Sequence, residues 1–338
     1  MIRILSVALI LLITWSCSQN STKPAAVTFH NINSKYNAIW QADQLLENLQ
    51  REFQNERVEN YANELPIIAP MDSSFGISHK LEINNLIRKA SLVIDRHQNS
   101  KFVDDAYLLI AHGRYYQSDF KNAIETLKYI NTLEPDKQTQ RKAMTLLYQL
   151  YLMQHDIESA EKTETFILEN ELESWNYSLA KAFEHQVKGE INSSIQLVNQ
   201  LVSEAKNRHD RSRLYFILGQ MYERSNQSGL AQQAYQNSMR QKSNYELTLR
   251  ANIANKALEK SVSALEKLLE DPKNEDQKSE IYIALGKIYL EEQDLTKAKS
   301  AWQKATNNNP NKGELYFQLG NLFADQIHDY ARASAYFD

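Results

Sequence analysis

The sequence predicts an all-α protein: a solenoid of helix-turn-helix repeats that form a right-handed superhelix. Three observations support this class. A small residue recurs through the last two thirds of the 338-residue chain at intervals of 37, 34, 37, 33, 34 and 35 residues. Aromatic residues and leucine recur at fixed distances before it. Glycine (8) and proline (6) are scarce, as expected when helices fill most of the chain. The recurring small residues are Ala123, Ala160, Ser194, Ala231, Ala264, Ala298 and Ala333.

The clearest copy of the repeat lies between Ser279 and Pro310. It reads Tyr282-x2-Leu285-Gly286-x2-Tyr289, then Ala298-x3-Trp302-x2-Ala305. This is the tetratricopeptide repeat (TPR) pattern, whose unit is about 34 residues long. Gly or Ala at its eighth position lets two helices cross closely, and stacked pairs share one continuous core. The expected pairs are Asp104–Ile130, Arg141–Leu168, Trp175–Leu201, Ser212–Met239, Tyr245–Glu270, Ser279–Ala305 and Gly313–Asp338.

Two copies depart from the pattern. The third has Lys181 and His185 at positions that are usually in the core, and the fifth has Thr248 and Asn252 where an aromatic and a small residue are expected. We expect these copies either to be distorted or to face a partner.

The N-terminus carries a second signal. A short basic start, Met1-Ile2-Arg3, precedes an apolar run from Ile4 to Ile13 that is too short to span a bilayer. Ser16 and Cys17 follow, and this arrangement resembles a bacterial lipobox. The resemblance implies cleavage before Cys17 and acylation of its thiol. The alternative is an ordinary signal peptide with an incidental cysteine. No other cysteine is present, so a disulfide framework is excluded.

The sequence therefore divides into four parts. Residues 1–16 are the expected signal peptide, 17–32 a lipidated tether, 33–103 a helical N-terminal segment and cap, and 104–338 about seven TPR units, the last incomplete. Asn33 and Ser34 are expected to cap a helix. A second helix, His79–Arg96, is expected to cover the first repeat. The first helix should bury one apolar face made of Tyr36, Trp40, Leu46, Leu49 and Phe53.

Composition and motifs argue against enzymatic activity and against nucleic-acid or metal binding. The formal net charge is −4, and removal of Arg3 with the signal leaves 37 basic against 42 acidic residues, a charge of −5. This balance predicts no nucleic-acid partner. The sequence has no HExxH pair or other metal-ligand spacing, no phosphate-binding loop and no nucleophile elbow. We therefore expect no enzymatic activity, no cofactor, no metal and no small-molecule substrate.

Binding to other proteins is the predicted role, through the concave groove that the first helix of each TPR lines. Exposed aromatics beside arginine are good interface anchors. The alternative for each is packing against the next helix. Capture of chaperone tails is not expected, because Asp105, Leu108 and His112 replace the usual carboxylate clamp. The candidate groove residues are Leu108, His112, Tyr115, Tyr116, Phe183, Phe216, Arg224 and Phe317.

Three stretches carry a resemblance to a known family. They are Phe29–Ala38 (FHNINSKYNA), Asp104–Ile110 with Asp119-Phe120, and Asp271–Glu275 (DPKNE). In this order after a lipobox they resemble the SprE/PorW lipoproteins of the type IX secretion and gliding machinery of Bacteroidota. The resemblance implies a periplasm-facing, lipid-anchored adaptor that docks protein components of that machinery. The alternative is another envelope TPR lipoprotein, such as an outer-membrane-protein assembly or polysaccharide-handling adaptor. Members of that family are longer, so we expect this chain, which ends at Asp338, to be C-terminally truncated.

Overall fold

The computed structural model describes residues 21–61, 63–307, 313–321, 323–324, 328 and 330–337. Every regular element in these ranges is helical. The chain divides into two compact units. Unit 1 contains residues up to Glu59 together with Ile68–Lys188, and unit 2 contains Asn60–Ile67 together with residues from Gly189 onward. Within the described ranges, no helix is long and apolar enough to cross a bilayer.

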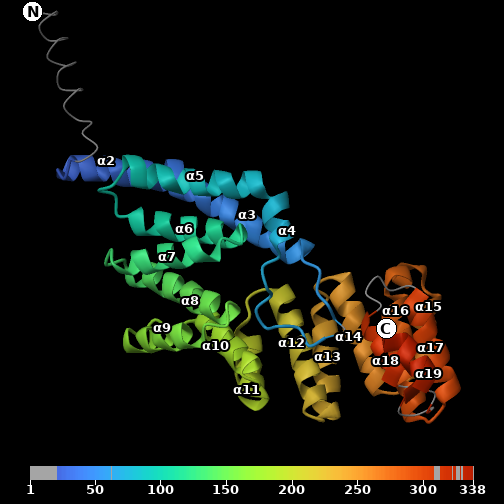
Figure 1. Ribbon diagram of the computed structural model, residues 1–338. Coiled ribbons are helices and arrows are strands. Elements are labelled where there is room, and N and C mark those ends of the chain that lie inside the picture. Colours follow the sequence, from blue (N-terminus) through green and yellow to red (C-terminus); the bar gives the residue numbers. More distant parts are fainter. Residues whose placement is uncertain are drawn as a thin grey trace, which may run out of the picture. The chain divides into compact units, whose positions relative to one another are not determined.

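Unit 1 holds the N-terminal helices and the first repeats (Figure 1). Helix α5 packs against α3 and α6, as expected for a helix that covers the first repeat. Its buried residues Ile83, Leu86, Ala90 and Val93 share one core with Leu109 of α6. The helices are α2 (Pro24–Ser34), the π-helical turn η1 (Lys35–Ile39), α3 (Trp40–Glu56), α4 (Ser73–Ser78), α5 (Lys80–Arg96), α6 (Val103–Tyr116), α7 (Phe120–Asn131), α8 (Lys137–Met153), α9 (Ile157–Glu169) and α10 (Trp175–Val187).

Unit 2 continues the repeats. Helices α12 and α13 form one pair, in the yellow part of Figure 1, and α16 and α17 form another. The helices are α11 (Ile191–Glu204), α12 (Arg208–Arg224), α13 (Ser228–Gln241), α14 (Tyr245–Leu258), α15 (Val262–Glu270), the 3₁₀ turn η2 (Pro272–Gln277), α16 (Lys278–Glu291), α17 (Leu295–Asn307), α18 (Gly313–Asn321) and α19 (Tyr330–Phe337).

The glycines at the eighth repeat position explain how closely the helices approach. A Cβ atom added to Gly219 would lie 2.4 Å from the ring of Tyr235, and one added to Gly286 would lie 2.1 Å from Nε1 of Trp302. These distances are well inside van der Waals contact, so no larger residue fits without repacking. The aromatic residue of the second helix therefore lies directly over the glycine of the first.

Among the described residues, the turn between the two helices of each repeat contains one residue with positive φ. These residues are Ser118, His155, Gly189, Asn226, Lys260, Gln293 and His328. Only one is glycine, although a left-handed conformation strains other residues. In five turns the amide that follows this residue donates to a carbonyl five residues earlier, for example Asp294 N to Tyr289 O at 2.8 Å. This bond satisfies a free carbonyl at the helix end, as in a Schellman motif.

The N-terminal segment differs from expectation. Asn33 and Ser34 do not cap a helix, because the helix already begins at Pro24, inside the stretch expected to be a tether. Proline suits the first helical position. The helix is also held to the end of α5: His30 Nδ1 lies 2.8 Å from His97 Nδ1, and the Asn31 side chain accepts a 2.9 Å bond from Lys101 N.

The apolar face predicted between Tyr36 and Phe53 is correct at its C-terminal end, in α3, and wrong at its start. Leu49 and Phe53 are buried, whereas Tyr36 and Trp40 are 60% and 59% exposed. Trp40 follows the π-helical turn Lys35–Ile39 and lies nine residues before Leu49, which at about 100° per residue puts it on the opposite side of α3. Ala38, Ile39 and Ala42 fill the core instead.

Candidate partner-binding grooves

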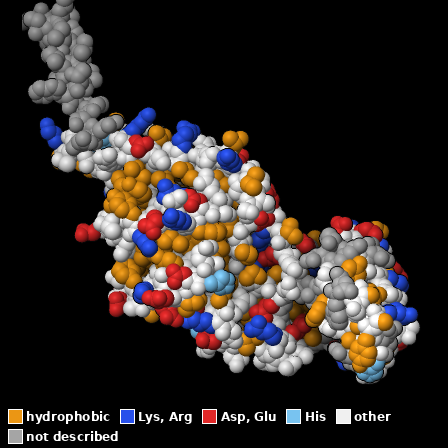
Figure 2. Space-filling model, viewed as in Figure 1, with side chains coloured by type: hydrophobic (Ala, Val, Ile, Leu, Met, Phe, Trp, Pro, Cys, Tyr) orange, Lys and Arg blue, Asp and Glu red, His pale blue; other side chains and the backbone are white. Residues whose placement is uncertain are grey.

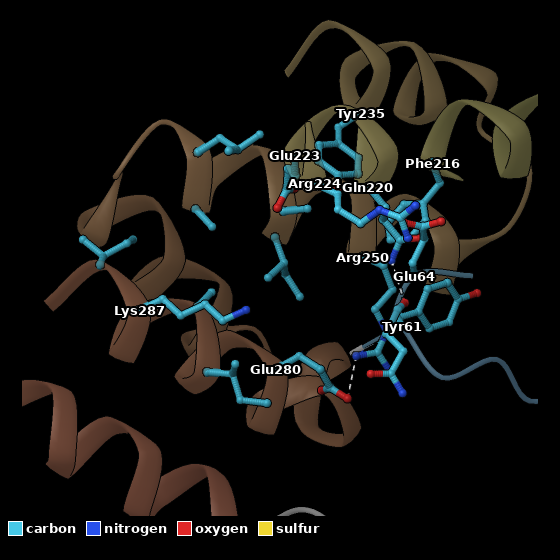
Figure 3. A pocket seen from close by; sticks show the side chains of 18 of the residues that line it. Tyr61, Glu64, Phe216, Gln220, Glu223, Arg224, Tyr235, Arg250, Glu280 and Lys287 are labelled. Atoms are coloured by element: carbon cyan, nitrogen blue, oxygen red, sulfur yellow. Dashed lines mark hydrogen bonds and ion pairs between the residues drawn. The ribbon is translucent and has the colours of Figure 1, made fainter. Parts of the chain in front are cut away.

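Unit 2 contains a hollow of about 540 Å³ that fits the expected concave groove. Its lining comes mainly from α12, α14 and α16, which are the first helices of successive repeats. Tyr235 of α13 and Tyr61, Asn63 and Glu64 of the segment between α3 and α4 complete it (Figure 3). Small and aliphatic residues of α14 and α16 contribute its apolar lining: Ile253, Ala254, Ala257, Leu258, Ile283, Ala284 and Ile288. Such a mixed lining suits an extended protein segment.

Charged side chains surround this apolar lining. Arg250 Nη1 lies 2.6 Å from Glu280 Oε1, and Arg224 Nη1 lies 3.1 Å from Glu64 Oε2. Lys287 is exposed and its ammonium group points into the hollow (Figure 3). The hollow therefore offers both signs of charge to a bound segment.

Unit 1 has its own hollow, of about 700 Å³, lined mainly by η1, α3, α6 and α8. Asp105 of α6 accepts a 2.9 Å bond from Thr139 Oγ1, and burial raises its pKa. Burial, with the nearby charge of Lys142, lowers the pKa of His112 to about 4. Burial also raises the pKa of Asp43. At neutral pH His112 is therefore uncharged, which suits hydrogen bonding to a polar partner.

Beyond this hollow, α10 carries a buried carboxylate. The side chain of Glu184 is 1% exposed. It accepts a 2.6 Å bond from Tyr148 Oη and lies 2.5 Å from Lys181 Nζ and 2.8 Å from Lys188 Nζ. Although burial alone would raise its pKa, hydrogen bonds from Lys181, Lys188 and Tyr148 lower the pKa of Glu184 to about 2. Lys181, one of the irregular residues of the third repeat, also pairs with Glu164 at 2.8 Å. The irregular residue therefore belongs to a buried ionic cluster.

The face of unit 1 drawn in Figure 2 mixes apolar, acidic and basic side chains. Within the described ranges, no group of three or more His, Cys, Asp or Glu side chains is placed to hold a metal ion.

Comparison with known proteins shows what kind of repeat this is. No protein-family profile and no curated protein matches the chain. Among solved structures, a tetratricopeptide repeat protein from Parabacteroides merdae superimposes with a TM-score of 0.56 at 15% identity, covering 69% of this chain and 90% of that one. The chain has a tetratricopeptide repeat fold. Cut9–Hcn1 from the APC/C gives a TM-score of 0.45 at 13% identity, covering 94% of this chain and 56% of that one. The predicted all-α TPR class is confirmed.

Four predicted groove residues line the two TPR hollows. Leu108 and His112 lie in the hollow of unit 1, and Phe216 and Arg224 lie in that of unit 2. Leu108 and Phe216 are 6% and 3% exposed, so their side chains also pack between helices.

The remaining groove candidates lie elsewhere. Tyr116 belongs to the core of unit 1, where its ring centroid is 6.0 Å from Phe53, and Tyr115 packs against the same core. These two tyrosines are covered by the N-terminal helices, which the TPR pattern alone does not predict. Phe183 is 9% exposed and Phe317 55% exposed, and neither lines these hollows. Cys17, the predicted acylation site, lies outside the described residues.

Sequence reasoning missed two parts of the unit 2 groove. Gln220 and Arg250 line it, as does the segment from Tyr61 to Glu64. Gln220 lies four residues after Phe216 on α12, one helical turn on, so the spacing of the groove positions was a signal for it. The segment had no such signal, because nothing in its local sequence indicates which repeat it contacts.

Proposed function

We propose that this protein is a lipid-anchored scaffold of the cell envelope that docks a component of the type IX secretion and gliding machinery. The TPR fold indicates a protein-interaction scaffold. The observation that supports docking most directly is the unit 2 hollow, where the first helices of successive repeats surround an apolar lining with Arg224, Arg250 and Lys287. TPR grooves of this build suit protein segments better than small molecules.

The anchor and the envelope location rest on the N-terminal sequence. The basic start, the apolar run and Ser16-Cys17 support acylation of Cys17. Several acyl chains hold a protein firmly at a membrane, whereas one binds only marginally. The body of the repeats would then face the periplasm.

The machinery is proposed from the resemblance of Phe29–Ala38, Asp104–Ile110 and Asp271–Glu275 to the SprE/PorW lipoproteins. In this role the protein performs no chemistry. The acyl chains keep the array at the membrane, and the groove holds a secretion component there.

A clean deletion of the intact gene tests the assignment. We expect the deletion to stop export of type IX cargo and any surface gliding, as read by mass spectrometry of the culture medium and by colony spreading. Normal cargo export would overturn the type IX assignment. Native pull-downs that recover barrel-assembly subunits instead of secretion components would do the same and would identify the other adaptor class.

The anchor has its own test. Cys17→Ala should abolish fatty-acid labelling and move the protein out of the membrane fraction. Ser16→Ala is the matched control, because it keeps the cysteine and a small residue before it. Equal labelling of wild type and Cys17→Ala would contradict acylation at this site.

A further inference from the structure

The segment Asn60–Ile67 is the most informative feature that the proposed function leaves unused. Its described residues, 60–61 and 63–67, have no regular secondary structure, and it belongs to unit 2 although the residues on both sides of it belong to unit 1. It runs along α12 on the side that faces the hollow, and we call it the groove segment. Figure 3 shows Tyr61 and Glu64 of this segment beside Phe216, Gln220 and Arg224.

The groove recognises the backbone of this segment. The Gln220 side chain accepts a 2.9 Å bond from Leu65 N and donates a 2.8 Å bond to Asn63 O. Arg213 donates to Ile67 O at 2.8 Å and to Pro66 O at 2.6 Å. Backbone amides and carbonyls are common to all peptides. These four bonds would therefore form equally well with another extended peptide.

The side chains of the groove segment supply selectivity. The Tyr61 ring lies 5.4 Å from Phe216, edge to face, and the Arg250 guanidinium lies 5.0 Å from its centre. Glu64 pairs with Arg224, and Leu65 is only 2% exposed. An aromatic residue and an acidic residue three positions later thus each meet a matching group, and the apolar residue that follows is buried. This is how extended peptides are commonly read: main-chain bonds give affinity and alternate side chains give specificity.

Arg213 makes release of the groove segment unfavourable unless another chain takes its place. The residue is 5% exposed, and its guanidinium donates to Ile67 O and Pro66 O of the groove segment. Loss of hydrogen-bond acceptors around a buried cation is costly. A peptide that displaces the segment should therefore offer carbonyl groups in the same places.

We propose that the unit 2 groove binds an extended segment of a partner protein with the chemistry of Tyr61–Ile67, and that the groove segment occupies the site until that partner displaces it. The proposal rests on the proposed scaffold function and specifies its ligand. The occupant in trans carries an aromatic residue, an acidic residue three positions later, and then apolar residues. It would continue from the place of Tyr61 into the open part of the hollow over α14 and α16, which the groove segment leaves unfilled.

The test uses the purified full chain and a fluorescent synthetic peptide with the sequence of residues 60–68, read by anisotropy. Wild type should bind it weakly, because the site is already occupied. The double variant Tyr61→Ala, Leu65→Ala weakens the hold of the groove on its own segment and should tighten peptide binding about tenfold or more. The reason is that the apparent affinity for the peptide is proportional to the fraction of molecules whose groove is empty. Adding Gln220→Ala should remove that gain. A scrambled peptide is the negative control.

A charge exchange perturbs the fold little, because Arg224, the only residue of the protein that is changed, has a side chain that is 48% exposed. The Arg224→Glu chain should prefer a peptide with Arg at the position of Glu64, and wild type should prefer the native peptide, each by a few-fold as for a partly exposed ion pair. Circular dichroism checks that all variants stay helical.

Three results would overturn the inference. The first is that the double variant Tyr61→Ala, Leu65→Ala stays helical but binds the peptide no tighter than wild type, and that Arg224→Glu does not prefer the peptide with Arg at the position of Glu64. The second is a gain that survives Gln220→Ala. The third is a wild-type dimer, by light scattering, that the peptide dissociates, because the segment of a second copy would then be the natural occupant. Any of these, with cargo export still lost on deletion, leaves the proposed function intact. Peptide binding as expected, with export unaffected, overturns only the proposed function.

Discussion

The first helix of the third repeat and the first helices of two later repeats fill the same positions in different ways. In α12 and α16, the residues 13 and 10 positions before the small residue of the repeat are apolar and buried: Leu218 and Met221, and Leu285 and Ile288. In α10 the same positions hold Lys181 and Glu184. Glu184 is as deeply buried as the apolar residues that it replaces.

The difference shows that a repeat position constrains burial more strongly than it constrains polarity. An ionic residue is tolerated there when partners satisfy it, and Glu184 has three: Lys181, Lys188 and Tyr148. Without them, burial of the carboxylate would be strongly unfavourable. The cluster is therefore expected to respond to mutation and to pH in ways that the apolar repeats do not.

Removal of the buried carboxylate should have the largest effect. Glu184→Ala removes the acceptor of the Tyr148 hydroxyl and one of the two carboxylates that pair with Lys181, and it should lower the free energy of unfolding by roughly 3–5 kcal/mol. Urea denaturation followed by circular dichroism measures this. Glu161→Ala is the matched control: Glu161 also pairs with Lys188, at 3.0 Å, but is 57% exposed, so its loss should cost less than about 1 kcal/mol.

Replacement of the ionic cluster by the apolar residues usual at these repeat positions tests whether the cluster itself adds stability. The triple variant Lys181→Leu, Glu184→Ile, Tyr148→Phe should recover most of the stability lost in Glu184→Ala, because replacement of a buried ion pair by well-packed apolar residues is often neutral or stabilising. A triple variant as unstable as Glu184→Ala would show that the ionic cluster stabilises the fold more than an apolar core at the same positions does.

Acid should weaken the ionic repeat next. The pKa of Glu184 is about 2 when folded, below the ordinary 4.5, so its contribution to stability is complete above pH 4.5 and disappears as pH falls toward 2. The shift corresponds to about 3 kcal/mol at 1.36 kcal/mol per unit. Comparison of urea midpoints at pH 5 and about pH 3 should show a smaller drop in Glu184→Gln than in wild type. An equal drop would contradict this assignment.

Filling the space above a glycine tests the apolar repeats. Gly286→Ala places a Cβ against the indole of Trp302 and should destabilise by roughly 1–3 kcal/mol. Gly229→Ala is the control, because no atom lies within 4 Å of the new Cβ and alanine favours the helix. We expect thermal melting to move in opposite directions for the two substitutions.

The turns, which both kinds of repeat share, should give the smallest effect. Gln293 has φ of 62°, so Gln293→Gly relieves strain while adding freedom to the unfolded chain, and a gain below about 1 kcal/mol is expected. Gln303→Gly, inside α17, should instead lose about 1 kcal/mol. Loss of stability in Gln293→Gly would show that its side chain matters more than its backbone.

The sequence predicted the repeats well because their period is local. The regular spacing of Ala231, Ala264 and Ala298 locates the helix pairs directly, and the close packing of Trp302 on Gly286 follows from that spacing. The sequence identified Lys181 as irregular but not the role of Glu184. Tyr148, which donates to Glu184, and Glu164, which pairs with Lys181, both come from the preceding repeat.

Features that depend on distant contacts were not predictable. Tyr116 is buried by Phe53 and Phe75, more than 40 positions earlier in the chain. The groove segment contacts Gln220 across 155 residues, from Leu65.

The groove segment also sets the kinetics of binding. Arg213 and Gln220 cannot hold two backbones at once, so a partner must wait for the segment to leave. Release is a unimolecular step that does not depend on partner concentration. The observed association rate should therefore rise with partner concentration and then level off at the rate of segment release. The scaffold would thus admit partners at a rate that its own chain determines, however abundant they are.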